Sequence, residues 1–310
     1  MNMTRRQFQK SVTLAAASTI VGKNARATNS NSLRLGGPVF GTFKDPNDWA
    51  KAHIDIGYRA AYCPVKYNDP EVLKQAYVKA AADVDIVISE VGAWSNPIST
   101  NDSERRTAIQ KNVNSLALAD EIGAMCCVNI AGSRGASWAG PHEDNLRADT
   151  FDLIVETVRK IIDEVKPKRA FYTLETMPYT IPDSPESYLK LIKTIDRPQF
   201  GCHLDPVNMI SSPRRYFYNG QLLKESFDLL GPYIKSCHAK DIILRDKLTV
   251  HLDEIRPGLG RLDYAMFLHE LSKLPGSIGL MMEHLKTDNE YQRAGAYIRS
   301  VAEKESVSIL

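Results

Sequence analysis

Four side chains that can bind a metal or carry a proton stand at regular intervals in the second half of the 310-residue chain. Glu175, Asp205, His238 and Glu283 are 30, 33 and 45 residues apart, and each lies at the end of an apolar run of strand length. Three carboxylates and one imidazole form a mostly oxygen ligand set, which suits one divalent ion: Mn²⁺ foremost, with Mg²⁺, Co²⁺ or Zn²⁺ as alternatives. Carboxylates gathered at one height repel one another unless a cation neutralises them, which favours a metal site over four unrelated structural groups.

The elements that must position these residues alternate between apolar runs and longer helical patterns. We predict strands at 35–43, 59–65, 86–91, 124–131, 170–175, 200–205, 234–239 and 278–283, each followed by a helix. Helix-start signals such as Asp45-Pro46 and Ser184-Pro185 support this division. Eight strand–helix units imply a parallel sheet, and near-continuous apolar strands favour a closed barrel.

We therefore predict an α/β protein with a single (β/α)8 TIM barrel over residues 28–310. A doubly wound open sheet is the alternative, but no G-x-G-x-x-G motif follows the first strand. In TIM barrels the active site lies at the carboxyl ends of the strands. The four candidate ligands would then meet on one side of the barrel mouth.

Several short motifs around these residues are similar to those of a known family. The motifs are Leu174-Glu175-Thr176, Leu204-Asp205-Pro206-Val207-Asn208, His238-Ala239-Lys240-Asp241, Pro257-Gly258-Leu259-Gly260 and Met282-Glu283-His284. They resemble the sugar phosphate isomerase/epimerase superfamily of xylose isomerase-like TIM barrels over most of the chain after the first 27 residues. The resemblance implies that Glu175 and Glu283 are both metal ligands and catalytic acid/base groups, whereas Asp205 and His238 are ligands only.

The resemblance also implies a reaction, namely isomerisation or epimerisation of a keto-sugar through a metal-stabilised enediolate. The ion would bind the carbonyl oxygen and a neighbouring hydroxyl oxygen, which acidifies the C–H between them. One glutamate would remove that proton, and the other would return a proton to the opposite face or to the next carbon.

The sequence departs from the ketose 3-epimerases of this superfamily at two points. Asn208 stands where they usually have a histidine, and an amide can hydrogen-bond a hydroxyl but cannot take a proton. They also carry an arginine beyond the seventh strand, for which Arg245 and Arg256 are candidates. A second reaction therefore stays open, in which a lyase or hydrolase cleaves 3-keto-glycosides by elimination after the same proton abstraction.

Other polar and aromatic residues near the predicted strand ends are candidates for binding the substrate. Lys240 lies two residues after His238, on the same strand face. Trp94 and Trp138 could stack on a sugar or cap the barrel. His203 and His284 neighbour the ligands, and we predict that they face the opposite side of their strands as structural groups. The full set of substrate-binding candidates is Asn208, Lys240, Trp94, Trp138, Glu90 and Arg256.

The N-terminus has the features of a targeting segment rather than of a folded element. A twin-arginine pair, Arg5-Arg6, precedes an apolar stretch over residues 12–22 and an Ala25-Arg26-Ala27 cleavage site. We predict a twin-arginine signal peptide over residues 1–27, with the twin-arginine translocase as partner and the periplasm as destination. The apolar stretch is too short to span a bilayer, so we expect that the protein is not integral to a membrane.

The net charge argues against a nucleic-acid-binding protein, and the cysteine spacing argues against a disulfide-linked fold. Without residues 1–27, 34 Lys and Arg face 37 Asp and Glu, a net charge of −3. Binding to duplex nucleic acid needs a basic surface, so we expect no nucleic-acid partner. The five cysteines show no paired spacing, and we interpret them as buried side chains rather than disulfides or ligands.

Two other functions fit a barrel with this mouth. An endonuclease IV-like phosphodiesterase needs a trinuclear site rich in histidine, and the whole chain has seven histidines. A non-catalytic sugar-binding barrel would not need the carboxylates of Glu175, Asp205 and Glu283.

The resemblance to sugar isomerases and epimerases implies a sugar or keto-glycoside as the small-molecule partner. A homo-oligomer is compatible with the sequence.

Overall fold

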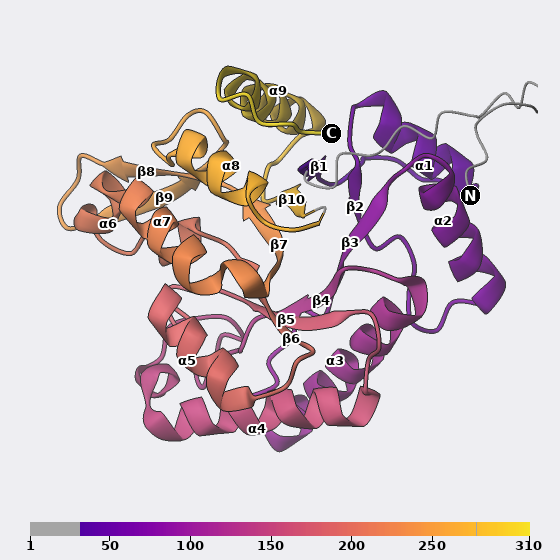
Figure 1. The fold of residues 1–310 in the computed structure, drawn as a ribbon. Helices are drawn as coiled ribbons and strands as arrows, with labels where there is room; N and C mark the ends of the chain where they lie inside the picture. Colours follow the sequence, from indigo (N-terminus) through magenta and orange to yellow (C-terminus); the bar gives the residue numbers. More distant parts are fainter. Residues whose placement is uncertain (1–31, 277) are drawn as a thin grey trace, which may run out of the picture.

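Eight parallel strands form a closed barrel in the described part of the chain (Figure 1). The computed structural model describes residues 32–276 and 278–310. The strands run in the order β1-β10-β7-β6-β5-β4-β3-β2, and β1 pairs with β2 to close the ring. Their bounds are β1 Arg34–Gly36, β2 Ala60–Tyr62, β3 Val87–Gly92, β4 Cys126–Asn129, β5 Phe171–Glu175, β6 Phe200–Leu204, β7 Ile234–Ala239 and β10 Gly279–Met282. The predicted TIM barrel is confirmed, and the open doubly wound sheet was the wrong alternative.

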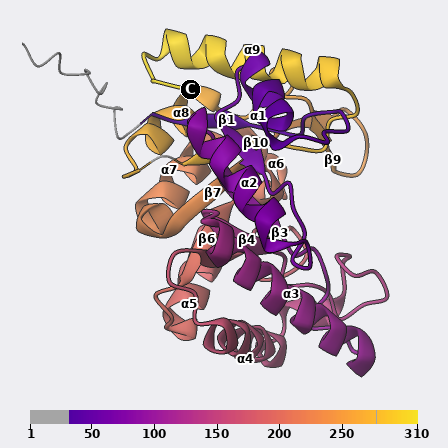
Figure 2. The same cartoon turned by 90° about the vertical axis from the view of Figure 1, so that its right-hand side faces the viewer.

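Helices connect successive strands and surround the barrel, with α9 and α4 on opposite sides of it (Figures 1 and 2). The α-helices are α1 Pro46–Asp55, α2 Glu71–Asp83, α3 Asp102–Ile122, α4 Ala148–Val165, α5 Pro185–Ile195, α6 Pro213–Phe217, α7 Asn219–Leu230, α8 Tyr264–Ser272 and α9 Asp288–Lys304. Three short 3-10 turns accompany them: η1 Glu143–Leu146, η2 Val207–Met209 and η3 Gly231–Tyr233.

Two of the predicted helix starts show the local chemistry that the sequence indicated. The Asp45 carboxylate accepts a hydrogen bond from the Asn47 N–H at 2.7 Å, and Pro46 is the first residue of α1. Ser184 and Ser187 form a capping box at the start of α5. Each cap satisfies N–H groups that the first helical turn leaves without a partner.

Two elements differ from the sequence-based expectation. The first strand ends at Gly36 instead of extending to residue 43, because Gly37 and Pro38 follow and proline has no N–H for a strand ladder. The connection between β7 and α8, where we predicted no strand, contains an antiparallel hairpin of β8 Asp241–Arg245 and β9 His251–Ile255. In this hairpin Ile242 faces Glu254 and Leu244 faces Leu252, so these side chains share one face.

The hairpin is attached to the barrel by one buried carboxylate. Asp241 is 1% exposed, and its oxygens accept hydrogen bonds from the N–H groups of Ile242, Gly258, Gly260 and Leu262 at 2.8–3.0 Å. These bonds tie the base of β8 to the loop before α8. A side chain at position 260 would collide with Asp241, which explains the glycine there. Asp241 therefore has a structural role, in which it binds backbone N–H groups rather than a charged side chain.

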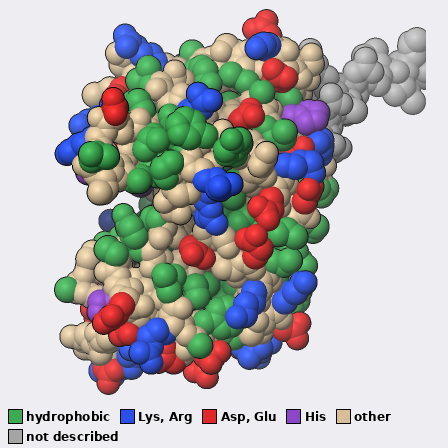
Figure 3. All heavy atoms as spheres, turned by 90° about the vertical axis from the view of Figure 1, so that its left-hand side faces the viewer, with side chains coloured by type: hydrophobic (Ala, Val, Ile, Leu, Met, Phe, Trp, Pro, Cys, Tyr) green, Lys and Arg blue, Asp and Glu red, His purple; other side chains and the backbone are tan. Residues whose placement is uncertain are grey.

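The surface drawn in Figure 3 carries Lys and Arg side chains interspersed with Asp and Glu, and its outline is indented at the left. No helix of the described residues is long and apolar enough to cross a membrane. The twin-arginine segment over residues 1–27 lies outside the described residues, so export stays a prediction.

The Asp241 contacts predict a clear effect on stability. Asp241→Ala should lower the free energy of unfolding by about 3 kcal/mol, because buried N–H groups lose their acceptor. Asp253→Ala is the matched control on the same hairpin: its side chain is 54% exposed and paired with Arg245. The control should change stability by no more than about 0.5 kcal/mol. Chemical denaturation measures both, and equal stability of the two variants would contradict the anchoring role.

Candidate metal centre and active site

The four predicted ligands converge at the carboxyl ends of β5, β6, β7 and β10. One ligand atom from each of Glu175, Asp205, His238 and Glu283 lies within 4.8 Å of all the others. The His238 Nδ1 atom is 2.9 Å from Glu283 Oε1, 3.2 Å from Glu175 Oε1 and 3.6 Å from Asp205 Oδ2. Ligands that share one ion at bond lengths near 2.1 Å are themselves about 3 Å apart. The observed spacing therefore fits a single divalent ion.

Charge balance at this cluster supports the same interpretation. The Lys240 ammonium is 2.7 Å from Asp205 Oδ2, 2.5 Å from Glu283 Oε1 and 3.5 Å from Glu175 Oε1, and the residue is 2% exposed. With a neutral imidazole, three carboxylates and one ammonium leave a net charge of −2, which one divalent cation neutralises. Among the described residues, Asp205 Oδ2 and Glu283 Oε1 are buried and contact the Lys240 ammonium and His238 without a hydrogen bond of good geometry.

The pKa values show how strongly this site stabilises positive charge. Burial raises the pKa of Glu175 to about 7, although His238 and Lys240 oppose the shift. Burial also acts to raise the pKa of Asp205, but the Lys240 ammonium and His238 outweigh it and the pKa is lowered. For His238 burial disfavours the charged ring, yet Glu283 and Glu175 raise its pKa well above the usual value. The carboxylates therefore favour positive charge at this point, as the raised pKa of His238 shows.

A second buried layer lies beneath the four candidate ligands and contacts the other side of the His238 ring. His238 Nε2 is 3.5 Å from Glu90 Oε2, while the Ser236 hydroxyl donates to Glu90 Oε1. The His203 ring centroid is 4.1 Å from that of His238, and His203 Nδ1 is 3.6 Å from Glu90 Oε1. Burial lowers the pKa of His203 to about 4, which keeps that ring neutral. A carboxylate behind a ligating histidine fixes the tautomer and orientation of the ring.

Two sequence-based interpretations need correction in this layer. His203 does not face away from the ligands: it precedes Asp205 by two residues, and the period of a strand places both on the inner face. Glu90 was predicted to bind the substrate. Its side chain is instead 1% exposed, and among the described residues it is not part of the lining of the cavity at the barrel mouth. Its carboxylate instead lies below His238.

A cavity of about 310 Å³, here named the mouth cavity, opens directly above the four candidate ligands. Glu175 and Glu283 reach it from β5 and the end of β10, and the Asn208 amide donates to Glu175 Oε1 at 3.0 Å. Four of the predicted substrate-binding residues line the cavity with them. The complete lining is Trp94, Ile130, Trp138, Ala139, Glu175, Met177, Asn208, Lys240, Glu254, Glu283 and His284.

Three residues at the mouth differ from the prediction. Arg256 is outside the lining of this cavity, and its guanidinium donates to the Pro257 carbonyl at 3.3 Å. His284 was predicted to face away, but it lines the cavity with its backbone at φ 59°, which turns it out of the strand path. Glu254 was missed altogether. It comes from β9 and lies 3.1 Å from His284 Nδ1 and 3.6 Å from the Lys240 ammonium.

Comparison with known proteins assigns the chain to one family. The sequence profile of the xylose isomerase-like TIM barrel family matches residues 51–301. The chain belongs to this family. No functionally curated protein matches the sequence significantly.

Solved structures with the same fold include magnesium-bound and sugar-processing proteins. A xylose isomerase-like TIM barrel protein from Mycobacterium smegmatis in complex with magnesium is 16% identical, with a TM-score of 0.64 over 89% of this chain and 98% of that one. D-psicose 3-epimerase from Clostridium cellulolyticum, solved with D-tagatose, is 13% identical, with a TM-score of 0.63 over 90% and 100%. The 3-keto-D-glucoside 4-epimerase from E. coli is 12% identical, with a TM-score of 0.60 over 87% and 100%. The chain therefore has the fold of sugar isomerases and epimerases.

The contact between Glu90 and His238 predicts an effect on metal affinity. Glu90→Gln should weaken Mn²⁺ binding about 10- to 100-fold while the barrel stays folded, because the imidazole loses its charged orienting partner. Titration calorimetry with Mn²⁺ measures the change. Glu121→Gln is the control, since that carboxylate pairs with Lys74 at the opposite end of the barrel, at the C-terminal end of α3. Unchanged affinity in Glu90→Gln would remove Glu90 from the site.

Proposed function

We propose that this protein is a divalent metal-dependent enzyme of the sugar isomerase and epimerase type that acts on a keto-sugar. The observation that carries the proposal is the convergence of Glu175, Asp205, His238 and Glu283 on one point below the mouth cavity. Mn²⁺ is the ion we favour, with Mg²⁺, Co²⁺ or Zn²⁺ as alternatives, because three of the four donors are carboxylate oxygens.

A divalent ion held by Glu175, Asp205, His238 and Glu283 would supply positive charge beside a sugar carbonyl, which would acidify the neighbouring C–H and stabilise the negative charge that develops. Asp205 and His238 serve to hold the site in place. Asp205 Oδ1 accepts hydrogen bonds from the N–H groups of Val207 and Asn208 at 3.0 and 3.3 Å, which leaves Oδ2 directed at the cluster. Both residues are fully buried and do not line the cavity in the described chain.

Proton transfer falls to Glu175 and Glu283, the two candidate ligands that also line the cavity. They come from β5 and β10, which are separated in the barrel by β6 and β7, so they approach a bound sugar from two sides. Asn208 fixes Glu175 by a hydrogen bond of 3.0 Å. One glutamate removes the proton beside the carbonyl, and the other delivers a proton to the opposite face or the next carbon.

The remaining residues of the cavity orient the sugar. Lys240 lines the cavity between the carboxylates, so its ammonium would stabilise a substrate oxygen that becomes negative. Trp94 and Trp138 offer aromatic surface on the other side, and Trp138 is 44% exposed. Asn208 is the polar group that replaces the histidine of the ketose 3-epimerases.

Elimination from a 3-keto-glycoside uses the same first step and is the second candidate reaction. It is supported by the similarity in fold to the E. coli 3-keto-D-glucoside 4-epimerase and by the loss of a proton-carrying side chain at position 208. We further propose export by the twin-arginine translocase to the periplasm, which rests on residues 5–27 of the sequence alone.

Hydrogen exchange tests the mechanism. The Mn²⁺-loaded enzyme should place solvent deuterium on the carbon beside the carbonyl when free ketoses or keto-glycosides turn over in D₂O. Glu175→Gln and Glu283→Gln should each slow this exchange by about 100-fold or more, since an amide oxygen can bind a metal but cannot accept a proton. NMR of the recovered sugar measures the exchange.

Glu121→Gln again serves as the control variant and should exchange at the wild-type rate. Product that carries no deuterium on carbon and is not an unsaturated or rehydrated keto-sugar, or full activity of both glutamine variants, would contradict proton abstraction. Direct hydrolysis of a glycosidic or phosphate bond would leave every carbon position unlabelled.

A further inference from the structure

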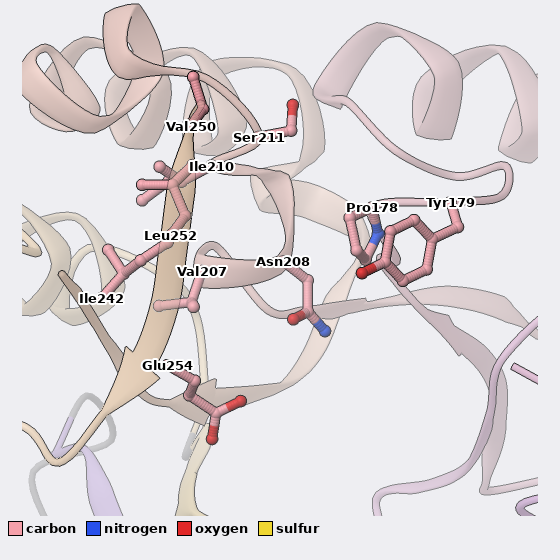
Figure 4. A pocket seen from close by; sticks show the side chains of 10 residues that line it. All are labelled: Pro178, Tyr179, Val207, Asn208, Ile210, Ser211, Ile242, Val250, Leu252 and Glu254. Carbon is pink, nitrogen blue, oxygen red and sulfur yellow. The ribbon is translucent and has the colours of Figure 1, made fainter. Parts of the chain in front are cut away.

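A second cavity of about 490 Å³ adjoins the mouth cavity beside the β8–β9 hairpin, and we name it the hairpin cavity (Figure 4). Its volume lies within the range of about 300–1,000 Å³ that small-molecule sites occupy. Asn208 and Glu254 line both cavities and therefore mark the border between them. A molecule whose first ring lies beside Glu175 and Glu283 in the mouth cavity can extend past this border into the hairpin cavity.

The hairpin cavity offers more polar than apolar surface to a bound molecule. Val207, Ile210 and Ile242 belong to its lining, but they are only 3–5% exposed and contribute little accessible apolar surface. The Glu254 side chain is 32% exposed, and Tyr179 is 46% exposed. The groups that a ligand would meet here are therefore to a large part able to form hydrogen bonds.

The mouth cavity has the opposite balance, with mainly apolar surface. Its apolar residues follow β3, β4 and β5 in the chain, and they are Trp94, Ile130, Trp138, Ala139 and Met177. This wall suits the C–H face of one sugar ring, but it offers few partners for the hydroxyl groups of another ring. A second hydroxylated ring would find its partners in the hairpin cavity.

Three polar side chains of the hairpin cavity have atoms available to a ligand. Asn208 donates its amide N–H to Glu175 at 3.0 Å, and Glu254 Oε2 lies 3.1 Å from His284 Nδ1. Among the described residues, Asn208 Oδ1, Glu254 Oε1 and the Tyr179 hydroxyl have no hydrogen-bond partner. Figure 4 shows the Tyr179 hydroxyl directed toward Asn208. Two acceptors and one hydroxyl match the hydrogen-bonding groups of a sugar.

The charge of the hairpin cavity disfavours an anionic ligand. Among the described residues, Glu254 is the one charged side chain in its lining, and neither lysine nor arginine lines it. The Lys240 ammonium is 3.6 Å from Glu254, but it lines the mouth cavity and lies close to Asp205 and Glu283. A phosphate or carboxylate group would meet the Glu254 carboxylate without a basic partner, and like charges repel. Uncharged hydroxyl groups fit this lining better.

The remaining surface of the hairpin cavity suits the C–H face of a sugar ring. Val250, Leu252 and Glu254 alternate along the chain, so they present one face of the hairpin to the cavity. Figure 4 shows the aliphatic side chains gathered on one side, with Pro178 and Tyr179 across the space from them. Five residue pairs join β8 to β9, so this wall is formed before a ligand binds and little ordering is needed.

We propose that the hairpin cavity binds a second, uncharged sugar ring that is attached to the first. The substrate is then a keto-disaccharide, whose oxidised ring occupies the mouth cavity and whose second ring forms hydrogen bonds with Asn208, Glu254 and Tyr179. This inference rests on the proposed function and names the substrate class of the same site.

The test compares substrates that share one oxidised sugar and differ in the attached group. Three 3-keto-glucosides are used in each anomeric configuration: the disaccharide with glucose (3-keto-cellobiose or 3-keto-maltose, oxidised in the non-reducing ring), the methyl glycoside and the 4-nitrophenyl glycoside. Titration calorimetry with Mn²⁺-loaded enzyme gives the affinities, and NMR after turnover in D₂O gives the exchange of carbon-bound hydrogen. In one configuration the disaccharide should bind at least about tenfold more tightly than both other glycosides.

Tyr179→Phe is the diagnostic variant, because it removes one hydroxyl from an exposed side chain and keeps its shape. The ratio of disaccharide affinity to methyl glycoside affinity should fall about three- to tenfold, as expected for one lost hydrogen bond. Tyr218→Phe is the matched control: Tyr218 is 58% exposed and lies outside the lining of both cavities in the described chain. The control should keep the wild-type ratio.

The outcomes separate the subsite from the proposed function. Exchange with the glycosides but no preference for the disaccharide in either configuration would overturn the subsite and leave the function standing. A 4-nitrophenyl glycoside that binds as tightly as the disaccharide, or a preference unchanged in Tyr179→Phe, would also overturn the subsite. A disaccharide preference that falls in Tyr179→Phe, without exchange or elimination, would overturn the function and leave the subsite standing.

Discussion

The fold concentrates negative charge at one end of a closed barrel, and the rest of the site depends on how that charge is balanced. Glu175, Asp205 and Glu283 lie in a largely buried cluster, where two like charges 4 Å apart repel by about 4 kcal/mol at an effective dielectric constant of 20. Lys240 supplies one positive charge directly among them. The cluster is still two charges short of neutrality, which is the charge of the divalent ion we propose.

Three features hold this acidic cluster in place: the barrel itself, the contacts beneath His238, and hydrogen bonds that join two strand ends. The parallel barrel brings four strand ends to one mouth. Beneath it, Glu90 and Ser236 support the far side of the His238 ring. The Tyr188 hydroxyl accepts hydrogen bonds from the N–H groups of Leu174 in β5 and His203 in β6, at 3.2 and 3.1 Å, and so joins the ends of these two strands. The ligands therefore depend on groups that never meet a substrate.

The sequence was sufficient to predict the barrel and the four candidate ligands, because both follow from local patterns. Apolar runs of strand length recur along the chain, and Glu175, Asp205, His238 and Glu283 each follow such a run. Glu90 and His203 were misinterpreted because their partners come from strands far apart in the sequence. His203 also stands two residues before Asp205, a spacing that indicated the inner face. Glu254 was missed with its hairpin, although the alternation of Val250, Leu252 and Glu254 was a signal for a strand.

The central claim is that the acidic cluster holds a divalent ion between Glu175, Asp205, His238 and Glu283, with the Lys240 ammonium beside it. A crystal structure of the protein with Mn²⁺, with anomalous diffraction recorded at the manganese edge, tests this most directly. We expect one anomalous peak within about 2.0–2.3 Å of donor atoms from Glu175, Asp205, His238 and Glu283, with Lys240 displaced from the centre. A cluster still occupied by the Lys240 ammonium, with no anomalous peak between the four side chains, would contradict the account.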